Sequence, residues 1–299
     1  MKGDKLLIVD FHALLHRSRN ALAKATGGLT TSDGRSTTGT YGFTNNLLSI
    51  IDIERPSHVV VCYDAGGNWR KEASSDYKAN RVRPIGEEAE RFNFEAKLVL
   101  DEILPAMGIE TVGIRGYEAD DAIYTLSKDA VDFNEIVILT CDQDILQCVT
   151  ERVRVLLFNS AKKVRMMGIP EVQEKWGVLP PHIALVKALS GDSSDNITGI
   201  RGIGPKTASQ IVIDSYGVLD KVLKHPKVEN HKAIVEANIV LIKPTYVTEL
   251  ESTNFSDYAL GNGIIEDVQS AFASLEFNVL SKRLEKIGEV LKLKSHAKV

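Results

Sequence analysis

Nine carboxylates stand where they could bind metal ions together. Three of them directly follow or close short apolar runs of the kind that form strands: LLIVD, VVVCYD and IVILTCD. The others lie in three short motifs: GYEADD, CDQD and SGDSSDN. The nine residues are Asp10, Asp64, Glu118, Asp120, Asp121, Asp142, Asp144, Asp192 and Asp195.

Parallel strands would bring these side chains together. In an open α/β sheet, residues just past the carboxyl ends of the strands converge on one crevice. Carboxylates gathered there repel one another by roughly 4 kcal/mol per pair at an effective dielectric of about 20. Divalent cations offset that repulsion, and hard oxygen ligands suit Mg²⁺ or Mn²⁺. The pattern therefore predicts two such ions, about 3.5–4 Å apart, at a phosphoryl-transfer site.

Each acidic position also has a simpler interpretation. A single aspartate after a strand is more often a helix cap or a turn residue. One or two acids of GYEADD would stabilise the start of a helix. Alternate residues Asp142 and Asp144 are expected on the same side of a strand end, and Asp192 and Asp195 on one helical turn. Three strand ends and three acidic motifs together favour a shared metal site.

A basic segment, GGNWRKEASSDYKANRVRP, begins just after Asp64. Taken alone, it would be typical of a solvated charged loop. Beside a metal site, its cations would hold the scissile phosphate and its aromatic rings would stack on unpaired bases. A long insertion in this position is also typical of a mobile lid or gateway. Its candidate residues are Trp69, Arg70, Lys71, Tyr77, Lys78, Arg81 and Arg83.

The motif GIRGIGPKTA predicts a second phosphate-binding element. Pro205 between Gly204 and Lys206 rules out a Walker A loop, and no strand precedes the motif. The pattern fits a helix–hairpin–helix turn, whose Gly202 and Gly204 allow close backbone approach to a phosphate. Lys206 and Thr207 would add contacts to the DNA backbone. The alternative is a glycine-rich turn that binds nothing.

Composition sets the protein class. The chain has 299 residues, 43% hydrophobic and 25% charged, as in ordinary globular proteins. Setting aside the nine candidate ligands changes the formal charge from −4 to +5, which permits a phosphate-binding surface. Three cysteines without close spacing indicate a reducing compartment. With no signal peptide or apolar stretch near 20 residues, we expect a cytoplasmic monomer that does not contact membranes.

The order of apolar runs predicts an α/β fold with a mostly parallel central sheet flanked by helices. Up to residue 168, strand-like runs alternate with helical patterns. After residue 169 helical patterns dominate, which predicts a second, helical region over 169–299, with the helix–hairpin–helix motif at 199–215. The expected strands are 5–9, 57–63, 109–114 and 135–140, with a hairpin over 153–167. The expected helices of the first region are 42–53, 87–104 and 118–130.

These motifs, in this order, resemble the 5′-nuclease domain of bacterial DNA polymerase I and the flap endonucleases of bacteriophages. The resemblance runs from LLIVDFHALLHR to SLEF near the C-terminus. It implies that the nine acids form a two-metal pocket and that Lys78 and Arg81 are the catalytic basic pair at the base of a helical arch around 66–94. It places Arg70 and Tyr77 in the DNA-binding segment. It also implies a potassium ion at GIRGIGPKTA.

The resemblance implies an enzyme of DNA replication and repair that cleaves flapped, branched or nicked DNA and RNA primers, in some contexts beside a polymerase. Three alternatives remain. A ribonuclease of the related PIN type would share the acidic pocket, although such domains are usually shorter. A silent DNA-binding scaffold would use only the helical half. A phosphatase would leave the helical half and the basic segment without a purpose.

Overall fold

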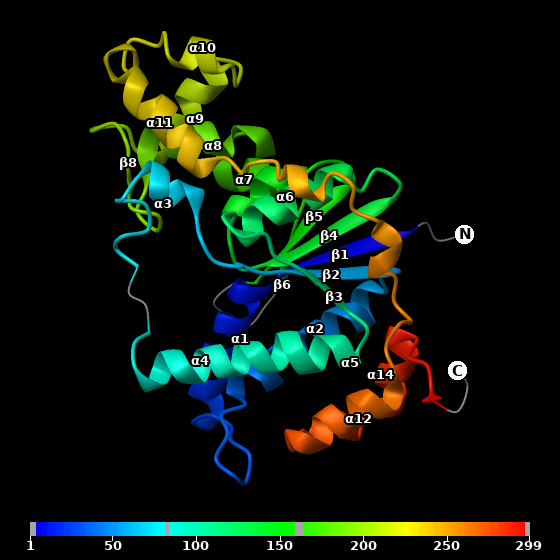
Figure 1. The fold of residues 1–299 in the computed structure, drawn as a ribbon. Coiled ribbons are helices and arrows are strands. Elements are labelled where there is room, and N and C mark those ends of the chain that lie inside the picture. Colours follow the sequence, from blue (N-terminus) through cyan, green and yellow to red (C-terminus); the bar gives the residue numbers. More distant parts are fainter. Residues whose placement is uncertain (1–3, 82–83, 159–163, 297–299) are drawn as a thin grey trace.

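A six-stranded sheet forms the centre of the computed structural model, which describes residues 4–81, 84–158 and 164–296 (Figure 1). The strand order is β3-β2-β1-β4-β5-β6. The first five strands are parallel, and β6 is antiparallel to β5. The strands are β1 (Lys5–Asp10), β2 (His58–Cys62), β3 (Glu110–Val112), β4 (Glu135–Thr140), β5 (Val153–Phe158) and β6 (Val164–Met167). The predicted sheet and its edge hairpin are confirmed, while the hairpin turn at 159–163 lies outside the described residues.

The inner residues of the central strands are apolar because both faces of the sheet are covered. In β1, Leu6 and Ile8 enter the core on one face, and Leu7 and Val9 enter the core on the other. None of the four side chains is exposed. Because β1 to β5 are parallel, they all end at the same edge of the sheet. Acidic residues lie at or just beyond the ends of β1, β2 and β4.

Helices pack on both faces. Helices α1 (Phe11–Thr26), α2 (Thr38–Glu54) and α4 (Glu87–Leu98) cover one face, and α4 continues through a π-helical turn (Val99–Ile103) into α5 (Leu104–Ala106). Helices α6 (Ala119–Asp129) and α8 (Ile183–Ser190) lie on the other face. The remaining helices are α3 (Trp69–Ala73), α7 (Ile169–Trp176), α9 (Pro205–Asp214), α10 (Leu219–Val222), α11 (Lys232–Ile242), α12 (Ile265–Ser274), α13 (Asn278–Ser281) and α14 (Leu284–Leu291).

Helix α1 is absent from our sequence-based prediction. Asp10 ends β1 and also caps this helix, because its side chain accepts a hydrogen bond from the Ala13 amide at 3.2 Å. The transition from strand to helix therefore takes place at a candidate metal ligand. Asp10 therefore has both roles that the sequence suggested for an aspartate after a strand, a helix cap and a candidate metal ligand.

The predicted helical region 169–299 is split in the structure. Helices α8 to α11 form a helical unit whose core is continuous with the α6 face of the sheet. The last helices return to the opposite face, where Val268, Phe272 and Leu291 join the core beneath α2 and α5 (Figure 1). Apolar periodicity identified these helices, but it does not say which face of the sheet buries them.

The motif SGDSSDN is also different from the prediction. It forms a small hairpin, with β7 (Gly191–Asp192) paired to β8 (Ile197–Thr198), instead of a helical turn. Gly191 and Gly199 permit this arrangement, since a Cβ on Gly199 would lie 2.3 Å from the Gly191 nitrogen. Asp192 thus lies in a strand and Asp195 in the turn that follows.

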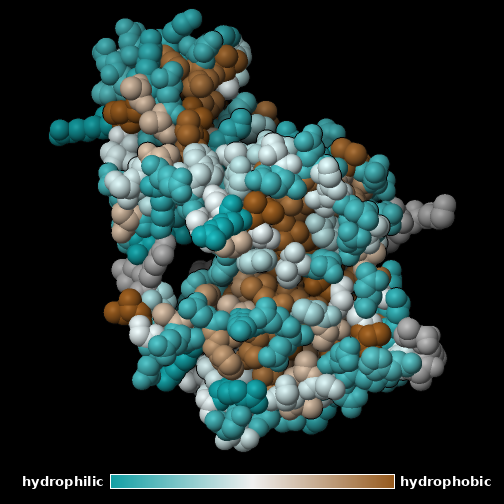
Figure 2. Space-filling view, in the orientation of Figure 1, coloured by the Kyte–Doolittle hydropathy of each residue, from teal (hydrophilic) through white to brown (hydrophobic). Residues whose placement is uncertain are grey.

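The predicted helical arch around 66–94, called the lid segment below, contains the short helix α3, a series of turns to Asn80 and residues 87–94 of α4. Arg83 lies outside the described residues. Figure 2 shows a hollow on this face of the molecule, between α4 below and α3 above. No helix in the described part of the chain is both long and apolar enough to cross a membrane.

Candidate active site

Asp10 lies at the centre of the acidic site, where β1 ends. Its carboxylate accepts a hydrogen bond from the Thr140 hydroxyl at 2.6 Å. Burial, followed by the charges of Asp142 and Asp64, raises the pKa of Asp10 to about 7 although hydrogen bonds oppose the shift. The raised pKa means that additional positive charge is needed to keep this carboxylate ionised at neutral pH.

Asp120 faces the same strand ends from the first turn of α6. Burial raises the pKa of its carboxyl group well above the ordinary value, and the charges of Asp142 and Asp10 add to the shift. Lys78 opposes the shift. Helix α6 thus supplies a carboxylate to the crevice that β1 and β4 already line with acids.

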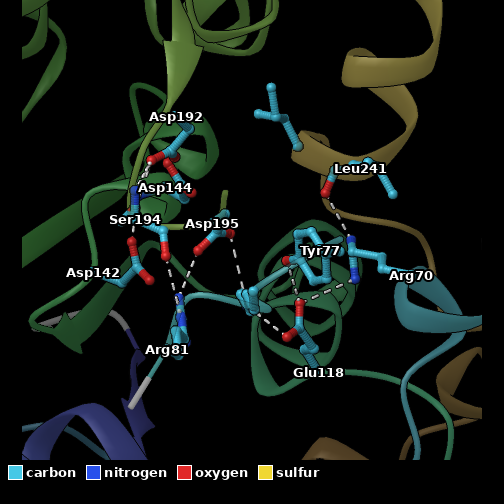
Figure 3. Close-up of polar contacts among 12 residues, drawn as sticks. Arg70, Tyr77, Arg81, Glu118, Asp142, Asp144, Asp192, Ser194, Asp195 and Leu241 are labelled. Carbon is cyan, nitrogen blue, oxygen red and sulfur yellow. Dashed lines mark hydrogen bonds and ion pairs between the residues drawn. The ribbon is translucent and has the colours of Figure 1, made fainter. Parts of the chain in front are cut away.

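A second part of the site contains Asp144, Asp192 and Asp195. One oxygen of each lies within 4.8 Å of the others, close enough to bind a single cation. Figure 3 shows Asp144 beside Asp192, with Asp195 next to them; they come from the start of a 3₁₀ turn after β4 and from the β7–β8 hairpin. Burial and the charge of Asp142 raise the pKa of Asp144 to about 7. The two parts of the site are therefore joined through Asp142.

Lys187 of α8 contacts the second part directly. Its ammonium group pairs with Asp144 and lies 2.6 Å from Asp192 Oδ2. Burial alone would raise the pKa of Asp192, but hydrogen bonds from Lys187 and Ser194 outweigh it and the pKa is lowered. We did not single out Lys187 from the sequence. Its position five residues before Asp192 in LVKALSGD is the only local signal, and a lysine on an apolar helix has many explanations.

Asp64 and Glu118 border the site on the α6 side. Asp64 Oδ1 accepts a hydrogen bond from the Ala119 amide at 2.8 Å, which ties the end of β2 to the start of α6. Its other oxygen lies 3.7 Å from His12 Nδ1. Glu118 Oε1 lies 2.5 Å from Lys78 Nζ.

Lys78 and Arg81 bring positive charge to the acidic residues. Lys78 Nζ also lies 3.8 Å from Asp195 Oδ2, and Arg81 Nη2 lies 2.6 Å from Asp195 Oδ1. Burial lowers the pKa of Lys78, but the charge of Glu118 and neighbouring acids outweighs this effect and raises it. Despite burial, neighbouring acids raise the pKa of Arg81 as well, so both cations remain charged beside the carboxylates. Figure 3 shows Arg81 pointing toward Asp195.

Asp121 is bound by hydrogen-bond donors of the protein itself. Its carboxylate has about four lone-pair positions, and four donors occupy them. Arg70 Nη1 and Nη2 each lie 2.7 Å from one of its oxygens, the Thr245 amide lies at 2.7 Å and the Glu118 amide at 3.2 Å. Asp121 is fully buried. This placement does not fit the predicted role of Asp121 as a metal ligand.

Arg70 is likewise unsuited to the predicted contact with DNA. A guanidinium group has five N–H donors, and acceptors of the protein use all five. Besides Asp121, they are Glu118 Oε2 at 3.4 Å and the carbonyls of Leu241 and Lys243 at 2.9 and 3.0 Å. Arg70 is only 2% exposed. It therefore joins α3, α6 and the end of α11, three segments that are far apart in the sequence.

Tyr77 is also buried, with 3% of its surface exposed. Its hydroxyl donates a hydrogen bond to Glu118 Oε2 at 2.9 Å. The ring therefore packs under Glu118 and is not available to stack on an unpaired base. We interpret Tyr77 as support for Glu118 in place of the DNA contact that the sequence predicted.

The helix–hairpin–helix turn lies apart from the acids, at the start of α9. Gly202 has a φ of 87°, which favours glycine, and Gly204 is the residue that precedes α9. Both glycines and Lys206 are exposed, and Thr207 is half-buried. An exposed helix N-terminus attracts phosphate through its free amides and its dipole. The geometry therefore fits the predicted contact with a DNA backbone.

The donor set of the acidic site fits divalent metal ions. The available ligands are carboxylate oxygens, which hard cations such as Mg²⁺ and Mn²⁺ prefer. Burial and mutual repulsion raise the pKa values of Asp10, Asp120 and Asp144, so bound cations would relieve a strain that the fold imposes. The fold and this site together define the class of metal-dependent, structure-specific 5′ nucleases.

Comparison with known proteins gives the family. Residues 5–177 match the family model for the 5′-3′ exonuclease N-terminal resolvase-like domain, and residues 178–244 match that for the 5′-3′ exonuclease C-terminal SAM fold. The 5′-3′ exonuclease of Bacillus subtilis is 36% identical over 227 residues, 75% of each chain. The chain therefore belongs to the 5′-3′ exonuclease family, as its motifs indicated.

DNA polymerase I proteins are further relatives. That of Treponema pallidum is 34% identical over 74% of this chain, and that of Chloroflexus aurantiacus is 32% identical over 96%. The aligned part spans only 22% and 31% of those proteins.

Solved structures share the fold at lower identity. The bacteriophage T5 D15 protein, co-crystallised with metal ions, has a TM-score of 0.65 at 21% identity, covering 96% of this chain and 99% of that one. Flap endonuclease-1 from Methanococcus jannaschii has a TM-score of 0.61 at 18% identity, covering 97% and 93%. The predicted fold class is confirmed.

Proposed function

We propose that this protein removes 5′ flaps and RNA primers from branched or nicked DNA by a two-metal mechanism. The observation that carries the proposal is the arrangement of eight carboxylates around one crevice, with Lys78 and Arg81 beside them. Such a density of acids is costly in a fold unless cations bind there. The family relationship supports hydrolysis of a phosphodiester as the reaction.

The metal ligands fall into two groups in this proposal. Asp144, Asp192 and Asp195 would hold one Mg²⁺ or Mn²⁺ ion. The second would lie among the acids at the ends of β1 and β4 and the start of α6: Asp10, Asp120 and Asp142. When bound, divalent ions supply a hydrolytic nucleophile at neutral pH and offset the charge that builds on the phosphate. Asp64 and Glu118 would contact the metal ions from the border of the site, in part through bridging water.

Lys78 and Arg81 would orient the scissile phosphate. Both are held next to carboxylates, yet Arg81 keeps 47% of its side chain exposed. A phosphate that enters between the acids and these cations would replace a carboxylate as the anionic partner of Lys78 and Arg81. Positioned cations of this kind stabilise the charge that develops in the transition state.

The helix–hairpin–helix turn would hold the duplex. Contacts from the start of α9 and from Lys206 to phosphates position a duplex without reading its sequence. We extend the proposal to a potassium ion at this turn. A structure of a T5 flap endonuclease variant with DNA and metal ions, and one of the Rad2 catalytic core with a DNA substrate, have the same fold. The relatives named DNA polymerase I make a polymerase a reasonable partner.

One assay tests the proposal. End-labelled flap, nicked and single-stranded DNA, and single-stranded RNA, are incubated with the protein in Mg²⁺ or in EDTA. We expect release of the flap near the junction in Mg²⁺ and no cleavage in EDTA. Cleavage of single-stranded RNA alone would favour the PIN-type ribonuclease, and absence of any Mg²⁺-dependent cleavage would favour the silent DNA-binding scaffold.

A further inference from the structure

The turn that contains Lys78 is docked on the β7–β8 turn of the helical unit. Lys78 has a φ of 55°, in the left-handed region that lysine seldom adopts. Its amide donates to the Asp195 carbonyl at 2.9 Å, so backbone and side chain of Lys78 both reach Asp195. The turn is therefore held in an unfavourable conformation by contacts with a segment more than a hundred residues away.

Two asparagine side chains complete this contact, one from each side. Asn80 Nδ2 donates to the Ser193 carbonyl at 2.7 Å. Asn196 Nδ2 donates to the Asp76 carbonyl at 2.8 Å. Each amide thus binds the backbone of the opposite turn, and together they bracket Lys78 and Asp195 along the chain. Nothing in the sequence motifs YKANR and SGDSSDN identified these residues.

We propose that Asn80 and Asn196 are positioning residues, which clasp the two turns and thereby fix the Lys78 and Arg81 side chains against the carboxylates. This inference rests on the proposed role of Lys78. A clasp of this kind matters because a cation misplaced by about 1 Å can cost up to about 100-fold in rate. The clasp also fixes the base of the lid segment to the helical unit. It therefore couples the half that binds DNA to the residues that act on the scissile phosphate.

A simpler explanation exists for Asn196 and can be tested. Its φ is 58°, and asparagine is enriched in the left-handed region without any side-chain contact. Asn196→Gly permits the same backbone conformation and removes the side chain that donates to Asp76. Asn196→Asp keeps the side-chain shape but removes the donor, and it serves if the glycine variant unfolds early.

The experiment measures single-turnover cleavage of 5′-flap DNA in Mg²⁺ and binding of the same DNA in Ca²⁺. We expect Asn80→Ala and Asn196→Gly each to slow cleavage by about 10-fold, with binding changed less than about twofold. In a Lys78→Ala background the same substitutions should add less than about twofold, because they act through Lys78. Asn230→Ala, on the exposed 3₁₀ turn Glu229–His231, is the matched control.

The outcomes separate this inference from the proposed function. Wild-type cleavage by Lys78→Ala would remove the proposed role of Lys78, on which the clasp depends. If Lys78→Ala is slow but the asparagine variants cleave normally, the clasp is overturned while the proposed function stands. Equal slowing in both backgrounds would also overturn it, since the asparagines would then act independently of Lys78. Thermal unfolding of every variant checks that the fold is retained.

Discussion

Two neighbouring groups of ionisable side chains lie at the start of α6. They differ in whether the lone pairs of their carboxylate oxygens are still free to bind another group. In the sealed pair, Asp121 and Arg70 use all their acceptor and donor positions on each other and on nearby protein groups. In the open site, burial and the charges of Asp142 and Asp10 raise the pKa of Asp120, and Lys78 only partly offsets this shift. One position along a helix therefore separates a structural carboxylate from a candidate metal ligand, because successive residues face different directions.

Cleavage should be reduced most when two acids of the open site are neutralised. Asp142→Asn with Asp144→Asn is expected to reduce cleavage by about 10³-fold or more, because metal-based charge stabilisation worth several kcal/mol is lost. End-labelled flap DNA in Mg²⁺ reports the rate, and binding in Ca²⁺ should survive. Asp121→Asn is the comparison within the same acid set: an equally complete loss of rate in a stably folded Asp121→Asn protein would contradict the division between the two groups.

Substitutions in the sealed pair should lower the stability of the protein. Arg70→Ala leaves the Asp121 charge buried without its partner, and we expect it to lower the free energy of unfolding by about 3–5 kcal/mol. Urea unfolding measures the change. The double variant Arg70→Met with Asp121→Leu should recover much of the loss, since it buries no uncompensated charge. If Arg70→Ala unfolds like the wild type but binds DNA weakly, Arg70 belongs to the open site after all.

Lys78 joins the open site from the lid segment. Lys78→Ala should slow single-turnover cleavage by roughly 100-fold with a modest loss of binding, as expected when one transition-state partner is removed. Lys128→Ala, which removes an exposed lysine at the far end of α6, is the charge-matched control. Similar effects from both variants would mean that only general charge matters.

The pH dependence of stability should report on the carboxylates of the open site. The pKa values of Asp10 and Asp144 are raised from 3.8 to about 7, so folding takes up protons between these values. Stability without divalent ions should therefore fall as pH rises from about 4 to 7. Mg²⁺ should restore it, raising Tm more at pH 8 than at pH 5.5. An increase in Tm that is independent of pH would argue against ions binding at these carboxylates.

The smallest effect is expected at the helix–hairpin–helix turn. Lys206→Ala should weaken DNA binding about equally for all sequences. It should also reduce the slope of log K against log salt concentration by about one, the contribution of one phosphate contact. Titrations at several salt concentrations measure this slope. An unchanged slope would show that α9 does not hold the DNA backbone.

The order of the elements and most of the candidate site could be predicted because their signals are local. Strands buried on both faces are continuously apolar, and acids at the ends of parallel strands converge whatever the rest of the fold does. This reasoning anticipated that Asp10 and Asp142 come together. It failed for SGDSSDN, where a spacing of three suggested a helix but a hairpin with two-residue strands brings Asp192 and Asp195 near Asp144.

The sequence by itself determined the sheet, the acids at its edge and the family to which the chain belongs. Tertiary structure decided which charges remain available: it saturated Asp121 and Arg70, placed Lys187 between two acids and docked the Lys78 turn on Asp195. The physical reason is that a carboxylate binds a metal ion only with lone pairs that no donor has filled. The donors that fill those of Asp121 come from segments 51 and 124 residues away as well as from Glu118 nearby.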